Sequence, residues 1–456
     1  TESPLVLDRW TLSDGTNDYL IYAADAEGDG SFDQIQVRRQ HMLMDQRGFG
    51  FLLSGTLTTL ADTTDIEVAG TEDAIIRGNF DLLGADSDLR IQSDNWVYWE
   101  GFANVTGDIQ VYGGVELDGS KADQSGIADD VLRESSVFIH PTAELNTQGA
   151  GTSIDIRGAQ DVDILGAVVA GGTVGQDGVT FAGDDSTIQV RAGEQIYLDN
   201  ALSAARSVTL SSGTAGADDD NLGIVANTVS GMTAAGLTSD GSGGTVTLNT
   251  DKDLETGDDL ETNSDIWMMG HIYAGGEAEQ EFNADNELIG ETIKWSDESG
   301  QVFFDSGGQA VVGGETTNKA GETVETGGYI KAKNQILITG GENPEGIGVK
   351  LPGAAEVVTH DPEGVISIDS TGDAEILGLL VSGGSIQEHR DASGEYLGRS
   401  IEYFNGNSEI QIRAENQVRV GQDLKAGKTV EIIGGGGTAA DLSGGPFADY
   451  AEQGLV

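Results

Sequence analysis

The sequence has no cysteine, only 6 prolines and few aromatic residues, which make up 6% of its 456 residues. Without cysteine no disulfide can form, so stability must come from backbone hydrogen bonds, side-chain packing or bound cations. The shortage of proline argues against a proline-rich disordered chain, and the shortage of aromatic residues argues against a large globular core. Glycine is abundant, at 68 residues, but shows no period of three. That excludes collagen and favours many tight turns between short strands.

Basic residues are also scarce: 23 lysines and arginines stand against 77 acidic residues, giving a formal net charge of −54. Such a surface repels nucleic acid and anionic membranes and attracts cations, so no nucleic-acid partner is expected. No run of 18 apolar residues is present, and no membrane span is expected. The chain begins with Thr1 and has no basic, apolar signal region, which is typical of a processed chain or a piece of a longer one. The composition fits a saline extracellular setting, or simply a large surface that must stay soluble.

A repeat emerges when residues 186–210 are compared with residues 408–432. The two segments align without a gap at 9 identical positions of 25. In the first, apolar residues occur in pairs spaced by two, which places both side chains of a pair on one face of a strand. The pattern recurs after 20 residues, and three short strands per coil is the simplest geometry that fits, so an all-β parallel solenoid is predicted. The pairs are Ile188 and Val190, Ile196 and Leu198, Leu202 and Ala204, and Val208 and Leu210.

The same template fits other parts of the chain, so the predicted parallel β-helix covers residues 68–437. A longer period of 108 residues relates two predicted modules. After Gly276 and after Gly384, alternating residues flank a turn rich in Asn, Asp, Ser and Gly, which predicts a β-hairpin in each module. The hairpins are interpreted either as arms that cover the side of the solenoid or as binding arms.

The individual matches are as follows. The 20-residue template is met by residues 154–174, at an offset of 34 from the unit at 186–210, by 246–266, by 366–386 and, in degenerate form, by 89–111, while 330–338 restates 190–198. The two modules are residues 258–328 and 366–436, in which 286–304 aligns with 393–412 and 319–325 is restated at 425–431.

The two ends of the chain do not fit the template. Residues 1–67 contain amphipathic strand candidates that are richer in aromatic residues than the rest. They are predicted to form a β-rich N-terminal cap, because an open first coil would pair with any similar edge. Residues 438–456 are predicted to be a tail that covers the last coil only thinly.

Three strings carry a family resemblance: GTVTLNT at 244–250, IQVRAGEQIYLDNALSAARSVTLSSG at 188–213 and VSGGSI at 381–386. They resemble the repeats of filamentous-haemagglutinin-like large exoproteins, which are secreted bacterial adhesins. The resemblance covers roughly residues 80–437. It implies a right-handed parallel β-helix, and an extracellular rod used in adhesion, matrix or surface structure.

A candidate calcium loop lies in the segment DAEGDGSFD, residues 25–33. Oxygen ligands at alternate positions can wrap a hard cation, and Gly30 stands where a calcium loop needs a sharp turn. The segment resembles the calcium loops of EF-hand-like and thrombospondin-type-3-like repeats, but Gln36 replaces the bidentate glutamate at position twelve. The alternative is an acidic β-turn between two strands. The predicted ligands are Asp25, Glu27, Asp29, the carbonyl of Ser31, and Asp33.

An enzyme is the main alternative to a structural protein, because polysaccharide lyases and hydrolases also occur on parallel β-helices. A hydrolase needs paired carboxylates, and 77 acidic residues supply many such pairs without singling one out. The five histidines are scattered, with no second histidine at metal-ligand spacing. The repeated Arg157, Arg191 and Arg413 are predicted to pair with acidic turns of the coils.

The most economical interpretation is therefore a non-enzymatic extracellular structural protein. It would be a segment of a self-assembling surface fibre, sheath or adhesin, stabilised by stacked ladders and by calcium. The partners expected are further copies of the chain joined head to tail, or glycans of the cell surface or matrix. The alternatives are a carbohydrate-active or carbohydrate-binding rod, and a passive stalk that holds another domain away from the cell.

Overall fold

The structure is a computed structural model, and it describes most of the chain. The described residues are 6–13, 18–24, 34–39, 49–70, 73–115, 122, 135–175, 178–183, 185–213, 222–226, 236–239, 244–249, 264–268, 270–282, 288–295, 299–317, 323–341, 346–390, 396–404 and 406–435. They form strands, turns and bends, with no helix among them.

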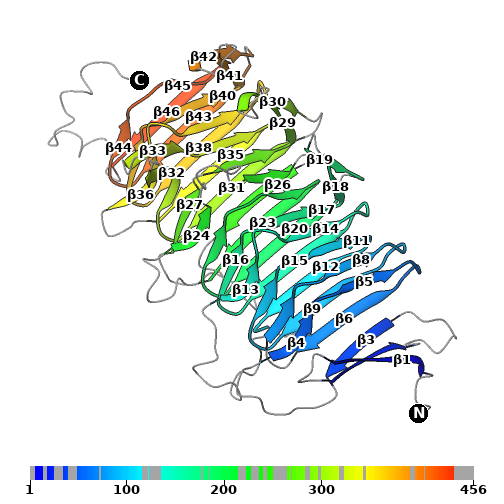
Figure 1. The fold of residues 1–456 in the computed structure, drawn as a ribbon. Helices are drawn as coiled ribbons and strands as arrows, with labels where there is room; N and C mark the ends of the chain where they lie inside the picture. The colour runs from blue at the N-terminus through cyan, green and yellow to red at the C-terminus, as the bar shows by residue number, and fades with distance from the viewer. Residues whose placement is uncertain are drawn as a thin grey trace, which may run out of the picture.

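Three long sheets, here called A, B and C, account for most of these strands (Figure 1). Sheet A contains, in spatial order, β1 (Val6–Ser13), β2 (Asp18–Ala24), β3 (Gln34–Arg39), β6 (Asp65–Gly70), β9 (Leu89–Ser93), β12 (Ile109–Gly113), β15 (Ser153–Gly158), β20 (Thr187–Ala192), β23 (Ser207–Ser212), β26 (Gly244–Asn249), β31 (Gly300–Ser306), β35 (Gln335–Gly340), β38 (Val365–Ser370), β43 (Glu409–Ala414) and β46 (Thr429–Gly434). Sheet B contains β4 (Phe49–Leu53), β7 (Asp73–Ile76), β10 (Val97–Trp99), β13 (Ser135–Ile139), β16 (Asp161–Ile164), β21 (Ile196–Leu198), β24 (Leu222–Ala226), β27 (Asp265–Met268), β32 (Ala310–Thr317), β36 (Ile347–Leu351), β39 (Asp373–Ile376) and β44 (Val418–Val420), with β33 (Thr323–Gly327) paired to β32. Sheet C contains β5 (Thr56–Thr59), β8 (Asn79–Leu82), β11 (Phe102–Val105), β14 (Glu144–Thr147), β17 (Ala167–Ala170), β22 (Leu202–Ala204), β25 (Gly236–Ser239), β28 (His271–Ala274), β34 (Tyr329–Ala332), β37 (Glu356–Thr359), β40 (Leu379–Ser382) and β45 (Leu424–Lys425).

The chain visits the sheets in the order A, B, C and returns to A, and successive visits pair in parallel. This confirms the predicted all-β parallel solenoid. Figure 1 shows the strands stacked along one elongated body, with β1 and β46 toward opposite ends. At the start of sheet A, β1, β2 and β3 pair antiparallel, and β3 then pairs in parallel with β6. Parallel pairing therefore already includes strands N-terminal to residue 68, since β4 and β5 also pair in parallel with β7 and β8.

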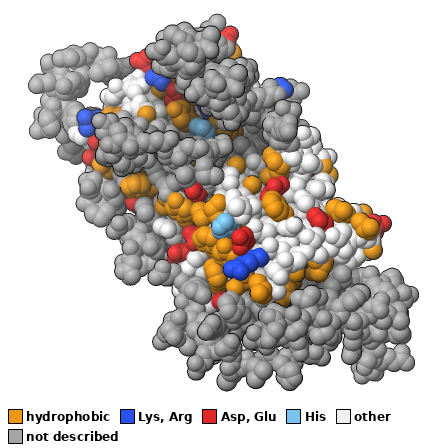
Figure 2. Space-filling view, viewed as in Figure 1, with side chains coloured by type: hydrophobic (Ala, Val, Ile, Leu, Met, Phe, Trp, Pro, Cys, Tyr) orange, Lys and Arg blue, Asp and Glu red, His pale blue; other side chains and the backbone are white. Residues whose placement is uncertain are grey.

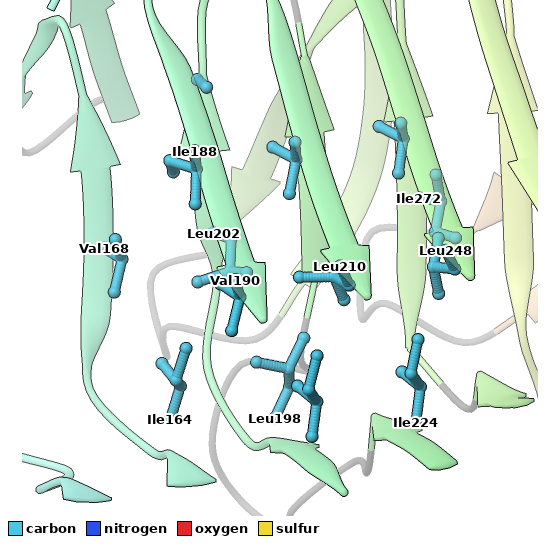
Figure 3. Packing of buried hydrophobic residues seen from close by; sticks show 14 of the residues in the cluster. Ile164, Val168, Ile188, Val190, Leu198, Leu202, Leu210, Ile224, Leu248 and Ile272 are labelled. Carbon is cyan, nitrogen blue, oxygen red and sulfur yellow. The ribbon is translucent and has the colours of Figure 1, made fainter. Parts of the chain in front are cut away.

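One continuous hydrophobic core fills the space between the three sheets. Equivalent residues of successive coils lie in register, so Ile154, Ile188 and Val208 are neighbours in one row, all essentially buried. Figure 3 shows such side chains pointing into the interior from strands of all three sheets. Buried residues alternate with less buried ones along strands such as β15, β20, β35 and β38, as the spacing of two predicts.

The repeat that relates residues 186–210 to 408–432 is also confirmed. Both segments run through strands of sheets A, B, C and A again, and the matched residues occupy the same strand positions. Other matches fail. Val174 does not continue the template into sheet A; it lies on the hairpin of β18 (Gly172–Gly175) and β19 (Gly178–Phe181), with 44% of its surface exposed.

Two further sequence matches join segments that are not structurally equivalent. Residues 330–338 run from sheet C to sheet A, whereas 190–198 run from sheet A to sheet B. Residues 323–325 belong to β33, which pairs antiparallel with β32, whereas 429–431 belong to β46 of sheet A.

The antiparallel pair β32–β33 extends from sheet B, and three further hairpins leave the solenoid at one corner, between sheet C and sheet A. They are β18–β19, β29 (Gly276–Phe282) with β30 (Leu288–Trp295), and β41 (Gly384–Arg390) with β42 (Tyr396–Tyr403), and the last two are the predicted pair. A glycine with positive φ precedes each: Gly171 (72°), Gly275 (78°) and Gly383 (72°). Glycine adopts this left-handed conformation at no steric cost, and it redirects the chain out of the coil.

The predicted pairing of arginines with acidic turns is wrong where the structure shows the partner. Arg157 Nη2 lies 2.8 Å from Asp155 Oδ2, two residues earlier on the same strand. Arg413 Nη2 lies 3.7 Å from Glu431 Oε2 on the next strand of sheet A. Asp155 and Arg157 pair on the outer face of sheet A because residues two apart on a strand share a face.

Candidate functional site

The C-terminal coil differs from the coils before it, and it is the candidate functional site. Its strands are β44, β45 and β46, and among the described residues each pairs on one side only. Val430 and Ile432 are in register with Ile410 and Ile412 of β43, so they belong to the rows that form the core. We call the described residues 418–434 the C-terminal end coil.

Core residues of this end coil are exposed. In β46, 36% of the Val430 surface and 47% of the Ile432 surface are accessible, and in β44 the value for Val420 is 39%. Their neighbours one coil back, Ile410, Ile412 and Ile376, are 0% exposed. The rod thus ends, within the described residues, in an apolar surface that faces along its axis.

The end coil also carries an unusual share of basic residues for so acidic a chain. Residues 418–434 contain three basic residues and two acidic ones. Lys428 Nζ lies 2.9 Å from Glu409 Oε1 and lowers the pKa of that carboxyl, and Lys425 Nζ lies 3.1 Å from Asp423 Oδ2. These pairs are largely exposed and contribute little to stability, so their main effect is on the local potential.

The opposite end of the solenoid is acidic. Residues 1–88, which include β1 through β8, contain 17 acidic residues and five basic ones. The pKa of Asp88 is raised by burial and further by the carboxylates of Asp65 and Asp108, so the negative charges there act on one another. At this end β4 and β5 are the terminal described strands of sheets B and C.

The hairpin β41–β42 fastens the coils near the C-terminal end. Ile386 and Ile401 of the hairpin pack on Val358, Leu379 and Val381, which point outward from sheet C. Such packing confers stability on a hairpin that could not fold alone.

Polar and aromatic contacts hold the same hairpin. Arg399 Nη1 donates to Glu356 Oε1 at 2.8 Å, and the Glu356 side chain is buried. The ring of His360 stacks on Trp295, with centroids 4.9 Å apart, and meets Phe404 edge-on at 4.7 Å. Since Trp295 belongs to β30 and Phe404 follows β42, His360 joins both long hairpins to the coil.

The predicted calcium loop, residues 25–33, lies outside the described residues, so the prediction about its ligands remains a prediction. Among the residues that the structure describes, no group of three or more histidine or acidic side chains could hold a metal ion. The described residues include no helix that could span a membrane.

Sequence reasoning missed the exposed core residues of the end coil, because their residue types match those of buried copies. It also missed the hairpin β18–β19, although a signal was present: Gly-Gly follows the sheet C strand at 171–172, 275–276 and 383–384 alike.

Fold and site together define a parallel β-solenoid with an apolar, weakly basic end coil and an acidic opposite end. Comparisons with known proteins add no relative. No protein-family model matches the chain, and neither a curated protein nor a solved structure matches it.

Proposed function

We propose that the protein is a structural rod that associates end to end with further copies of itself. The observation that carries the proposal is the exposure of Val420, Val430 and Ile432 in the end coil. Covering apolar surface is favourable by about 25 cal/mol per Å², and a parallel ladder that stops at an open strand offers unpaired backbone groups to a further strand.

A second copy of the chain is the occupant favoured by charge. The end coil has a formal charge of +1 from its three basic and two acidic residues, and residues 1–88 have −12 from five basic and 17 acidic residues. Stacking the acidic end of one copy on the end coil of another brings opposite charges together and keeps like ends apart. A heterologous contact of this kind produces an open filament.

The setting of such a rod is part of the proposal. An extracellular surface or matrix location is supported by the resemblance of the repeats to secreted adhesins and by the acidic composition. Calcium bound by Asp25, Asp29 and Asp33 would strengthen the contact, since these acids lie in the N-terminal part of the sequence.

Electron microscopy and sedimentation velocity test the proposal. The wild-type chain is expected to form filaments at high concentration with calcium, and the double variant Val430→Glu with Ile432→Glu is expected to stay monomeric, because it puts charge into the contact. Val174→Glu is the matched control, since Val174 is similarly exposed but lies on the side hairpin β18–β19.

Two outcomes would contradict end-to-end association. One is a wild-type chain that remains monomeric at high concentration with calcium. The other is a double variant that still forms filaments. If the wild type is monomeric and the double variant melts at a much lower temperature, the end coil is covered by the same chain and not by a second copy.

A further inference from the structure

The outer face of sheet B carries an array of rings and carboxylates over strands β10, β13, β16 and β21. Tyr98, Phe138, Asp163 and Tyr197 are in register on these four strands, one residue per coil. The residue that directly follows each strand forms a second row beside the first. The backbone N–H of each of these residues donates a hydrogen bond to a carbonyl oxygen of the preceding coil. They are Glu100, His140, Leu165 and Asp199. We call this array the sheet B patch.

Aromatic side chains form one end of the sheet B patch. The rings of Tyr98 and Phe138 stack with centroids 5.6 Å apart and planes 5° apart. Trp96 tilts against Tyr98 at 5.2 Å, and His140 lies within 6.5 Å of both stacked rings. All four side chains are partly exposed, so the cluster presents apolar edges and ring faces to solvent while its internal stacking holds it rigid.

Two carboxylates form the other end of the patch, and no basic side chain among the described residues forms an ion pair with either. Asp163 is in register between Phe138 and Tyr197. Burial raises the pKa of its carboxyl, and a hydrogen bond from Ser135 has a weaker, lowering effect. Burial alone raises the pKa of Asp199, whose Oδ1 is enclosed without a hydrogen-bond partner. Strand spacing and rise place the two α-carbons about 8 Å apart, one coil and two residues from each other.

An enclosed carboxylate oxygen without a donor, as Asp199 Oδ1 is among the described residues, is costly, and a ligand that brings hydroxyl groups would satisfy it. The aromatic end would at the same time pack against the apolar ring faces of the same ligand. A sugar chain has both features. The formal charge of −54 repels glycans that carry carboxylates or sulfates, so a neutral sugar chain is favoured over an acidic one.

We propose that the sheet B patch binds a neutral polysaccharide, with Asp163 and Asp199 accepting hydrogen bonds from sugar hydroxyls and Tyr98 and Phe138 contacting the sugar rings. Figure 2 shows hydrophobic side chains gathered with a histidine and with acidic and basic side chains on one side of the rod. The patch lies along the side of the rod, away from the end coil, so glycan binding is independent of end-to-end association. A filament would repeat the patch along its length and raise the avidity for a long chain.

The test uses the full-length chain carrying Val430→Glu and Ile432→Glu, so that assembly does not affect the result. Isothermal titration calorimetry measures binding of a soluble neutral β-glucan, a mannan and a galactan, with polygalacturonate as the acidic counterpart. At least one neutral polymer should bind, and polygalacturonate should not.

Substitutions then locate the site. Asp199→Ala and Tyr98→Ala are each expected to weaken binding about tenfold or more, because each removes a charge-assisted hydrogen bond or an aromatic contact. Asp163 is more enclosed than Asp199, and Asp163→Asn keeps the shape of its side chain. This variant is therefore expected to weaken binding less than Asp199→Ala does. Matched controls on the outer face of sheet A, Phe303→Ala and Asp369→Ala, should leave binding unchanged.

Several results would overturn the proposal. Failure of all three neutral polymers to bind the folded protein would do so, as would equal losses in the sheet A controls. Stronger binding of polygalacturonate than of neutral polymers would contradict the charge argument. If Tyr98→Ala abolishes sideways association of rods and no polymer binds, the patch is a protein contact. Circular dichroism of each variant separates a lost site from a lost fold.

Discussion

Residues 186–210 and 408–432 are near copies in sequence and in fold, yet they differ in burial. Val208 and Leu210 are 0% exposed because β26 pairs beyond them, whereas Val430 and Ile432, which match them, are partly exposed because no described strand lies beyond β46. Even the connections match, since a positive-φ glycine and a hairpin precede both copies. The comparison teaches that in a solenoid the neighbouring coil, and not the residue, determines whether an apolar side chain is core or contact surface.

The largest expected effect comes from truncating matched residues in the two copies. Leu210→Ala should lower the free energy of unfolding by about 3 kcal/mol, because it leaves a cavity between two coils. Ile432→Ala, at the matched position, should cost about 1 kcal/mol or less in the monomer, because the side chain is already half exposed. Urea titration at low protein concentration measures both. Equal losses would show that the end coil is covered in the free chain.

A smaller effect is expected at the glycines that start the hairpins. Gly383 has φ of 72°, and a Cβ there would lie 2.5 Å from Ser408 Oγ, so Gly383→Ala should destabilise the protein by about 1–2 kcal/mol. Gly171→Ala should behave alike, because its Cβ would overlap Ser186 Oγ, the matched serine of the other copy. Gly55→Ala is the control: nothing lies within 4 Å of its Cβ, and the melting temperature should not fall. A harmless Gly383→Ala would mean that the hairpin can leave the coil without a left-handed residue.

Much of the fold could be predicted because a strand has a side-chain period of two and a coil has a fixed length. The pairs Ile188 with Val190 and Ile410 with Ile412 could be recognised as core on that basis. Sheet identity could not be predicted, because residues 190–198 and 330–338 share apolar positions at steps of two, four and two while turning different corners. The prediction that Val174 continues the template was wrong, because Gly171 adopts a left-handed conformation and takes the chain out of the coil before Val174 is reached.

The candidate site was less predictable than the fold. Val430 and Ile432 have the residue types of a buried pair, so their exposure depends on what lies beyond β46 and leaves no mark in their own sequence. The carboxylates of the sheet B patch were hidden among 77 acidic residues. Asp163 and Asp199 are distinguished by the burial that raises the pKa of each carboxyl, which depends on residues from neighbouring coils.

The smallest expected effect is a pH response that differs between two hairpins: β18–β19, which precedes the first copy, and β41–β42, which precedes the second. His360 packs between Trp295 and Phe404, its Nδ1 is enclosed without a partner, and burial together with Lys333 lowers its pKa, against a weaker opposite effect of Asp361. The folded state therefore binds fewer protons than the unfolded state just below pH 6.5. The stability that neutral His360 contributes is complete above that pH and is lost as the pH falls toward the lowered pKa.

Hydrogen exchange between pH 8 and pH 5, corrected for the intrinsic rate, measures this response. Protection of β41–β42 should decrease below about pH 6.5, the ordinary pKa of histidine. Protection of β18–β19 should not, because residues 141–270 contain no histidine. His360→Phe keeps an aromatic ring between Trp295 and Phe404 and should remove the difference between the hairpins. A decrease that is equal in both hairpins would assign the pH response to carboxylates shared by the whole rod. A decrease that persists in β41–β42 of His360→Phe but not in β18–β19 would assign it to His389, which lies on β41.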